Sequence, residues 1–332
     1  MTVSIIIAVK TWQNNLKECI VKCLELDYPD FEIIILPDSE IGIDIKGLSP
    51  QLANPKETKG VVPTRIIPTG PVNPAQKRDI AASHAKGEIL AFIDDDAYPQ
   101  INWLKNAVRN FIDHEVAAVG GPSVTPENDN FRQKASGLVY STPLVSAKFV
   151  YRYSPGRKME VCDYPSCNFL VRKSVMQELG GFKTNFWPGE DTKFCLDITK
   201  RLGKKIIYDP GALVYHHRRA LFLPHLKQVA SYALHRGYFA KRYPQTSLKI
   251  AYFIPSLFLV FLLAGSLLTW FGGPLMIAYI FSLSLYLLLV IIFSIKKDLR
   301  MFPMIFLGII LTHLTYGFNF IKGLFSGRLK EE

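Results

Sequence analysis

The chain has 332 residues, is 49% hydrophobic and carries a formal net charge of +11 at pH 7, with a sequence pI of about 9.3. This charge would suit a nucleic-acid-binding protein, but zinc-finger spacing, a helix-turn-helix and an aromatic RNA-binding strand are all missing, so we expect no nucleic acid partner. Membrane attachment explains the excess better, because anionic lipid attracts nearby Lys and Arg by about 1 kcal/mol each. The five cysteines lack paired C-x-x-C spacing, which argues against a disulfide framework or a zinc site and predicts reduced thiols.

The N-terminal third alternates predicted strands and helices. In chain order these are a strand at Val3–Val9, a helix at Asn15–Glu25, a strand at Phe31–Leu36, a helix at Asn73–Ala85 and a strand at Ile89–Ile93. Residues 37–71 hold several Pro and Gly and are predicted to be loop, with one short strand near 65–67. The first segment lacks the basic start and cleavage site of a secretory signal. This order predicts an α/β fold with βαβ crossovers and a parallel sheet.

Three consecutive carboxylates, Asp94, Asp95 and Asp96, follow the apolar strand directly. Ligands of open α/β sheets gather outside the carboxyl ends of the strands, and a divalent cation makes adjacent carboxylates tolerable. The cluster therefore predicts a site for a metal-bound diphosphate. An alternative is a solvated acidic turn that caps a helix beginning near Trp103.

Two later clusters also carry candidate chemistry. Glu190 and Asp191 follow Trp187-Pro188-Gly189 and open a predicted helix, where acidic residues either stabilise the helix dipole or serve as a general base. His216 and His217 follow the apolar strand 213–215. A neutral imidazole at His216 would supply a metal ligand or a diphosphate contact, whereas His217 and the arginines after it would alternatively reach lipid phosphates.

The composition changes near residue 249. Residues 1–248 resemble an ordinary globular domain, which we assign to catalysis, and 249–325 form a membrane region with two to three transmembrane helices before a short tail at 326–332. The segments 250–271 and 274–295 are each long enough to cross the hydrocarbon core of a bilayer. The third, 302–321, contains Pro303, His313 and Asn319, so a full span and a re-entrant or interfacial helix are both open.

Basic residues flank the first span and recur between the second and third, whereas the Gly272-Gly273 link carries none. The positive-inside rule then places the catalytic domain in the cytoplasm and the chain in the inner (plasma) membrane as a multi-pass protein. A third full span would put the basic tail outside, in mild conflict with that rule. Residues 218–248 mix basic and aromatic side chains, which suits either a helix in the headgroup layer or an amphipathic helix packed on the soluble domain.

An ordered set of motifs resembles the family 2 glycosyltransferases over about residues 3–220. The set comprises Ser4-Ile5-Ile6-Ile7, residues 26–34, Arg78, residues 85–90 running into Asp94-Asp95-Asp96, Gly180-Gly181-Phe182 and Glu190-Asp191. The resemblance implies the GT-A nucleotide-diphospho-sugar transferase fold, a Rossmann-like mixed sheet. It also implies a nucleotide-diphosphate sugar donor, a divalent metal (Mg²⁺ or Mn²⁺) and inversion at the anomeric carbon.

Site roles follow from the same resemblance. It implies that Asp191 is the general base with Glu190 in support, and that Asp96 and His216 hold the metal. Donor contacts are implied for Ala8, Asp38, Arg78, Asp94 and Asp95, and acceptor contacts for Cys167, Asn168 and Trp187. Family members usually carry Asp-Asp at the end of the second strand, but this chain has Pro37-Asp38. That departure weakens any inference about the donor's base.

The expected activity is transfer of one sugar to a lipid-linked acceptor in cell-surface polysaccharide or glycan assembly. Processive synthases of the family carry a Q-x-x-R-W signature, whereas here Gln228 is followed by Arg236-Gly237 without a Trp. A polyprenyl phosphate acceptor is an alternative, as is a catalytically inactive membrane scaffold of the same fold. A transporter is a weaker alternative, because the apolar segments hold no carboxylate or Arg and His313 is their one ionisable residue.

Overall fold

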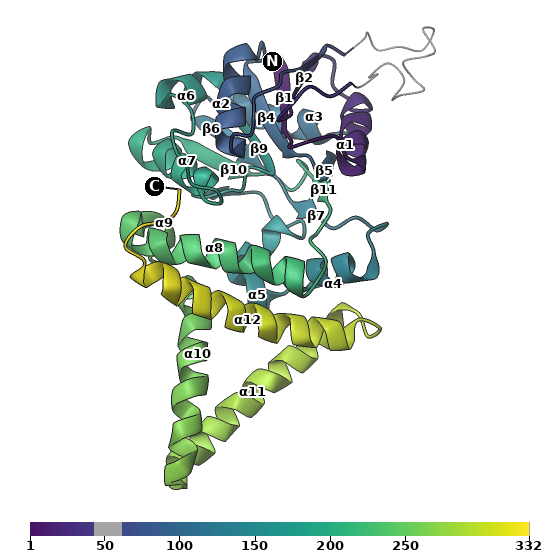
Figure 1. Ribbon diagram of the computed structural model, residues 1–332. Helices are drawn as coiled ribbons and strands as arrows, with labels where there is room; N and C mark the ends of the chain where they lie inside the picture. The colour runs from purple at the N-terminus through teal and green to yellow at the C-terminus, as the bar shows by residue number, and fades with distance from the viewer. Residues whose placement is uncertain (43–61, 332) are drawn as a thin grey trace. The chain divides into compact units, whose positions relative to one another are not determined.

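The computed structural model describes residues 1–42 and 62–331, which form two compact units (Figure 1). Unit 1 comprises Met1–Val124, Ser154–His217 and Glu331–Glu332, and unit 2 comprises Thr125–Tyr153 and Arg218–Lys330. Residues 125–153 and 218–248, which the sequence grouped with the globular domain, therefore belong to the same unit as the apolar C-terminal helices.

Unit 1 is built on an eight-stranded mixed sheet with the order β3-β2-β1-β4-β9-β6-β10-β8. The strands are β1 (Val3–Ala8), β2 (Phe31–Leu36), β3 (Thr64–Ile66), β4 (Ile89–Asp94), β6 (Val116–Gly120), β8 (Met159–Val161), β9 (Asn168–Arg172) and β10 (Lys205–Tyr208). Strands β3, β2, β1 and β4 pair in parallel, as the βαβ pattern predicts. Strand β9 runs antiparallel to both β4 and β6, so the mixed α/β sheet that the resemblance implies is confirmed.

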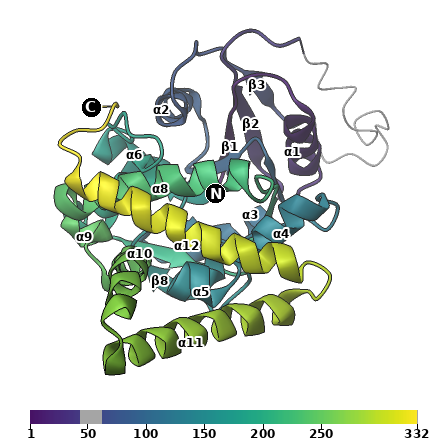
Figure 2. The same ribbon diagram turned by 60° about the horizontal axis from the view of Figure 1, so that its bottom comes forward.

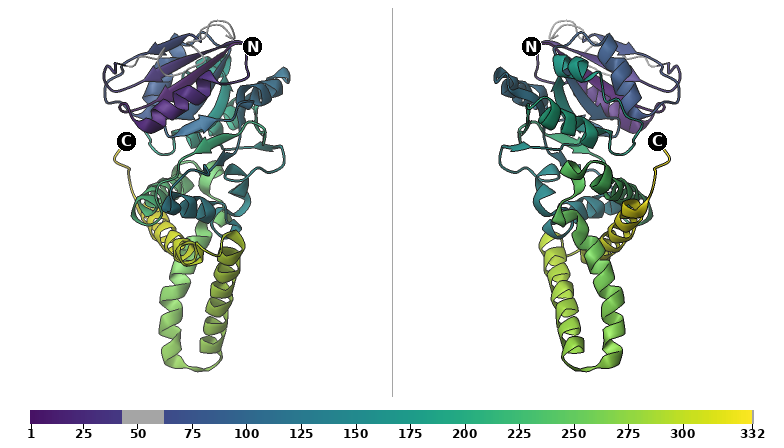
Figure 3. Two further views of the ribbon diagram at one scale, coloured as in Figure 1. Left: turned by 90° about the vertical axis from the view of Figure 1, so that its right-hand side faces the viewer. Right: turned by 90° about the vertical axis from the view of Figure 1, so that its left-hand side faces the viewer.

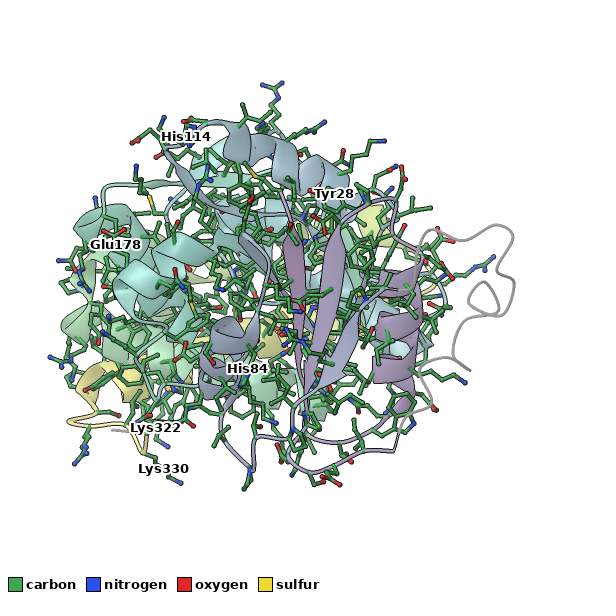
Figure 4. The ribbon with its side chains drawn as sticks, turned by 90° about the horizontal axis from the view of Figure 1, so that it is seen from above. Tyr28, His84, His114, Glu178, Lys322 and Lys330 are labelled. Atoms are coloured by element: carbon green, nitrogen blue, oxygen red, sulfur yellow. The ribbon has the colours of Figure 1, made fainter. Side chains whose placement is uncertain are left out.

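Helices cover both faces of this sheet (Figures 1 and 2). Alternate residues of the central strands, such as Ile5, Ile33 and Ala91, pack in one core with α1 (Asn14–Leu24) and α3 (Trp103–Val108). Helix α2 (Pro74–His84) lies on the opposite side of the sheet from α1 and starts in a capping box closed by Asn73. The remaining helices of unit 1 are α6 (Lys173–Leu179) and α7 (Glu190–Leu196). Seen from above, side chains fill the space between the sheet and these helices (Figure 4).

A small second sheet has the order β5-β11-β7, with β5 (Ala97–Pro99), β11 (Val214–His216) and β7 (Ser123–Val124). Strand β11 pairs antiparallel with β5, and the register sets His216 opposite Ala97. Because β5 begins directly after the three aspartates, this pairing brings a histidine from late in the chain to the acidic cluster.

Unit 2 is helical. Its helices are α4 (Phe131–Tyr140), α5 (Pro143–Ser146), α8 (Leu223–Arg242), α9 (Pro244–Ser247), α10 (Ile250–Leu268), α11 (Gly273–Lys297) and α12 (Phe302–Phe325). Of these, α10, α11 and α12 are long and apolar enough to cross a membrane. Figure 3 shows α10 and α11 as a hairpin. The single-turn and irregular segments of the two units are η3 (Arg109–Ile112), η4 (Ala147–Arg152), η5 (Asp197–Arg201) and η6 (Thr269–Phe271).

Most predicted elements lie within one or two residues of the observed ones. Strand β2 has the predicted bounds, and the short strand expected near 65–67 is β3. Part of the predicted 37–71 loop lies outside the described residues. All five cysteines, which fall within the described ranges, are free thiols, as expected.

Asn168, at the start of β9, ties three parts of unit 1 together. It is fully buried, and its Nδ2 donates to the carbonyl oxygens of Gly121 at 2.7 Å and Ala212 at 2.8 Å. Its Oδ1 accepts a hydrogen bond from the indole of Trp103 at 2.8 Å. Both ends of the amide are thus engaged inside the protein, and we do not propose Asn168 as an acceptor-binding residue.

We expect Asn168→Ala to lower the free energy of unfolding by about 3 kcal/mol, because several buried polar groups lose their partner at about 1–3 kcal/mol each. Thermal unfolding of the purified full-length chain measures the change. Asn185→Ala is the matched control, since Asn185 is exposed. Equal melting temperatures for the two variants would contradict this role.

Candidate active site

The three aspartates lie at the carboxyl edge of the parallel strands. Asp94 ends β4, where it lies opposite Ala8 of β1 in the pairing register. Ligand atoms of Asp94, Asp96 and His216 lie within 4.8 Å of one another. The solvated helix-capping turn is not what forms here, because the carboxylates converge with an imidazole instead.

His216 is the side chain that completes this cluster. Its Nε2 lies 3.0 Å from Asp96 Oδ1, and its neighbour His217 donates a backbone hydrogen bond to the Asp96 carbonyl at 2.9 Å. Burial alone would lower the pKa of His216, but the Asp96 carboxylate outweighs burial and raises it to about 10. Asp96 therefore favours positive charge at this position, and a metal ion bound by the His216 nitrogen would replace its proton.

Arg78 is buried between two carboxylates. Its guanidinium donates to Asp94 Oδ1 and to Glu190 Oε1, each at 3.0 Å, and its Cζ lies 5.9 Å from the ring centroids of both Phe92 and Phe182. Arg78 has a relative exposure of 4%. Both carboxylates raise the pKa of Arg78 against the opposing effect of burial. The resemblance implied a donor contact for Arg78, and the structure places its side chain as a buried link between the acidic cluster and α7.

Glu190 and Asp191 occupy the first turn of α7, after the cis peptide bond Trp187-Pro188. Glu190 is buried and accepts a hydrogen bond from the backbone of Gly189 at 3.0 Å. Burial and the adjacent Asp191 raise the pKa of Glu190 to about 7, while Arg78 opposes the shift. Asp191 is partly exposed and accepts from the Thr192 backbone at 2.6 Å. Asp191 is thus the more accessible carboxylate of the pair.

Asp95 points toward a different partner from its neighbours. Its carboxylate accepts a hydrogen bond from the side chain of Gln13, just before α1. Burial, Asp96 and Asp94 together raise the pKa of Asp95 to about 7. Asp95 therefore lies beside the metal-ligand group rather than within it.

Lys77 is a site residue to which the sequence analysis gave no role. Its Nζ donates to the carbonyl oxygens of Val9 at 2.6 Å and Leu36 at 3.1 Å, and to Asp38 Oδ1 at 2.5 Å. It therefore fixes Asp38 at the ends of β1 and β2. The buried positions of α2, which are 75, 77, 78 and 81, fall at helical spacing, which could have identified Lys77 as inward-facing.

Other predicted residues lie in varied surroundings. Cys167 Sγ lies 3.5 Å from Ser123 Oγ and hydrogen-bonds with His216, so it borders the metal-ligand group. Trp187 is 57% exposed and available to a ligand. His217 Nε2 lies 2.9 Å from Glu18 Oε2, so its partner is a carboxylate of α1 rather than lipid.

A divalent cation fits this donor set. Carboxylate oxygens are the ligands that Mg²⁺ and Mn²⁺ prefer, and one imidazole nitrogen is compatible with Mn²⁺. The fit rests on the convergence of Asp94, Asp96 and His216.

The sequence matches a known protein family. The family model for glycosyl transferase family 2 matches residues 4–180, more than half of the chain. The chain belongs to glycosyl transferase family 2.

Individual relatives are more distant than the family match. The curated "Pre-mycofactocin glycosyltransferase" of two Mycobacterium tuberculosis strains is 28% identical over 173 residues, which cover 52% of this chain and 36% of the relative. The chain thus matches about a third of the length of these relatives. The solved mannosyltransferase PcManGT from Pyrobaculum calidifontis, in complex with GDP-Man and Mn²⁺, aligns with a TM-score of 0.62 at 17% identity, over 98% of this chain and 88% of its own. That similarity shows a shared fold.

Glu190 should make the stability of this family 2 protein depend on pH. A carboxyl whose pKa rises from 4.5 to about 7 on folding stabilises the native state below about pH 4.5, and this contribution is lost as the pH rises to 7 and above. We therefore expect Glu190→Gln to gain melting temperature relative to the wild type between pH 5 and 8, by a few degrees.

Melting curves of the full-length chain without added metal test this. Glu178→Gln is the matched control, because Glu178 is an exposed glutamate on α6 (labelled in Figure 4). A difference between Glu190→Gln and the wild type that stays constant over this range would show that Glu190 does not titrate there.

Proposed function

We propose that the chain transfers a single sugar from a nucleotide-diphosphate sugar to a membrane-associated, lipid-linked acceptor, with inversion at the anomeric carbon. We place this reaction in the assembly of cell-surface polysaccharide or glycan precursors, at the cytoplasmic face of the inner membrane. The observation that carries the proposal is the group formed by Asp94, Asp96 and His216 at the carboxyl edge of the parallel strands. Family membership supports the nucleotide-sugar donor.

Asp94, Asp96 and His216 would hold Mg²⁺ or Mn²⁺. Bound there, the cation would neutralise the charge that develops on the leaving diphosphate as the glycosidic bond breaks. The solved complex of PcManGT contains Mn²⁺ and GDP-Man, and its fold is shared with this chain. Arg78 keeps Asp94 in place, because its guanidinium is itself fixed by Glu190 and two aromatic rings.

The nucleoside would lie along the edge formed by Ala8, Asp38 and Asp95. Lys77 holds Asp38 Oδ1 at 2.5 Å, and Gln13 holds Asp95, so both carboxylates are oriented before a ligand binds. Fixed carboxylates suit the hydroxyl and N–H donors of a ribose and a base.

Asp191 would take the proton from the attacking hydroxyl. A general base must lie within hydrogen-bond reach of the acceptor and be ionised at the working pH. Asp191 is the more exposed member of the acidic pair, whereas Glu190 is engaged by Arg78 and Gly189. Glu190 would thus position the first turn of α7, and Trp187 and Cys167 would border the acceptor.

The three long apolar helices support a membrane-associated acceptor. Two chemical classes of lipid-linked acceptor are to be distinguished. A polyprenyl phosphate is already ionised at neutral pH and needs no base, whereas a sugar hydroxyl does. The acidic pair at 190–191 favours the hydroxyl.

Donor binding should stabilise the full-length chain and require the cluster. We expect the matching nucleotide-diphosphate sugar, added with Mn²⁺, to raise the melting temperature. At a sugar concentration of 100 times its Kd, the free energy of unfolding should increase by about 2.7 kcal/mol. Asp96→Asn should abolish this gain. A panel of UDP- and GDP-sugars with and without Mn²⁺ identifies the donor.

Asp27→Asn is the control for that experiment, since Asp27 forms an exposed ion pair with Lys105. If Asp96→Asn and Asp27→Asn were stabilised equally by donor and Mn²⁺, the metal assignment would be wrong.

Asp191→Asn should reduce transfer to a sugar hydroxyl at least about 100-fold, the usual scale of general-base catalysis, with little change in donor affinity. Radiolabelled transfer to lipid-linked sugar and to polyprenyl phosphate measures both chemistries. Asp197→Asn is the matched control, because Asp197 follows α7 and pairs with Lys193. If the Asp191→Asn variant transfers sugar to polyprenyl phosphate at the wild-type rate, the hydroxyl-acceptor proposal is wrong.

A further inference from the structure

Helix α12 lies lengthwise against α8 (Figures 1 and 2). Toward one end, His225 Nε2 of α8 lies 2.9 Å from Thr312 Oγ1 of α12. At the other end, Lys241 Nζ donates to the carbonyl oxygen of Ser326 at 2.6 Å. The 14 residues from Thr312 to the end of α12 at Phe325 correspond to about 21 Å of helix, so the two helices run together over most of a bilayer's hydrocarbon thickness.

Glycines make this contact close and specific. A Cβ added at Gly237 of α8 would collide with the carbonyl oxygen of Phe320, and one added at Gly323 of α12 would collide with that of Leu234. The two backbones therefore touch, and α12 cannot move to a different depth in the membrane without α8.

Helix α8 is unsuited to the hydrocarbon core. It carries Lys227, Lys241 and Arg242 on its exposed surface, and Arg236 is partly exposed. Charged side chains are rare inside the bilayer because removing them from water is costly. Since α8 must remain near water, its partner α12 must remain there too.

The polar residues in the middle of α12 are also bonded to this part of unit 2. His225, which contacts Thr312, also contacts Ser136 Oγ of α4 at 2.8 Å, and burial lowers the pKa of His225 to about 4, so the ring is neutral. His313 Nε2 donates to the Leu144 carbonyl of α5 at 2.9 Å. These bonds come from α4, α5 and α8, which are not candidate membrane spans, and His313 Nδ1 also lies 2.9 Å from the Tyr286 hydroxyl of α11.

Helices α10 and α11 differ from α12 in burial. In the apolar segment of α10 only 11% is buried inside the protein, and in that of α11 only 6% is buried. The corresponding value for α12 is 33%. Large exposed apolar side chains run along both, including Leu257, Leu263, Ile277 and Leu285. In Figure 3 the two form a hairpin that extends away from α8 and α12. The part of the hairpin with exposed apolar side chains requires lipid around it.

We propose that α8 and α12 form an interfacial platform on an anionic bilayer surface, and that α10 and α11 are the two helices of the described chain that cross the membrane. The exposed apolar side chains of α12 (Leu307, Phe318 and Phe325) lie in the acyl boundary, and the basic side chains of α8 lie in the headgroup layer. The platform is continuous with the hairpin, which fixes lipid as its occupant.

With two membrane crossings, the distribution of basic residues agrees with the positive-inside rule. With two crossings, Lys249 before α10, Arg300 before α12, and Arg328 and Lys330 after α12 are all on one side of the membrane. With three crossings, the last two would lie on the far side. The positive-inside rule therefore favours two.

Labelling of the full-length chain in sealed membrane vesicles tests the proposal. Trp270→Cys and Gly327→Cys are each introduced with Cys162→Ser, and the unaltered chain reports the exposed Cys162 of unit 1. Trp270 is 89% exposed between α10 and α11, and nothing lies within 4 Å of a Cβ added at Gly327. A membrane-impermeant maleimide is added from one side, and the modified peptide is identified by mass spectrometry.

We expect Cys162 and the Gly327→Cys variant to react from the same side, and the Trp270→Cys variant to react from the opposite side. If Gly327→Cys and Trp270→Cys react from one side, α12 crosses the membrane and the platform is wrong. If Trp270→Cys reacts from the side of Cys162, the hairpin does not cross.

The unaltered chain provides a second measurement that does not depend on the variants. An impermeant amine reagent should modify Lys330 (labelled in Figure 4) from the same side as the exposed Lys105 of unit 1. Modification of these two lysines from opposite sides would overturn the proposal as well. Permeabilised vesicles, in which all these positions should react, are the control for reagent access.

Discussion

The arrangement of the candidate active site depends on one buried guanidinium. Arg78 is 4% exposed and is held by Asp94 at the end of β4 and Glu190 at the start of α7. A buried charge without partners is strongly destabilising, so the two carboxylates must remain in reach of it. The position of the metal-ligand group and that of the proposed general base are therefore set by the same side chain, although their residues lie far apart in the sequence.

Strand pairing supplies the rest of the metal-ligand group. The β5–β11 register and the bond from the His217 backbone to Asp96 bring His216 to the acidic cluster. The His217 side chain meets Glu18 of α1, so β11 is also fixed from its other side. A shift of one residue in this register would turn His216 away from Asp96, because successive side chains of a strand point to opposite faces.

Local sequence patterns predicted most helices and strands. Features that depend on pairing between distant segments could not be predicted. Apolar runs with flanking turns located β1, β2 and β4, and the acidic run after β4 located the site. The antiparallel placement of β9 and the transfer of residues 125–153 to unit 2 have no local signature, because both depend on partners distant in sequence. Lys77 and Asn168 show the same limit. The sequence shows that a lysine and an asparagine stand at these positions. Their structural roles could not be predicted, because each side chain donates to backbone carbonyl groups that only the folded chain brings together.

Two of the chain connections between the units start at the small sheet of unit 1. Strand β7 ends at Val124, where the chain leaves for unit 2, and β11 ends at His216, one residue before the chain leaves again for unit 2. These two strands are neighbours in the sheet. The strand that carries a metal-ligand candidate is thus followed, after His217, by the unit that contains the apolar helices. A single residue, His217, separates His216 from the segment of unit 2 that leads through α8 to the candidate membrane helices.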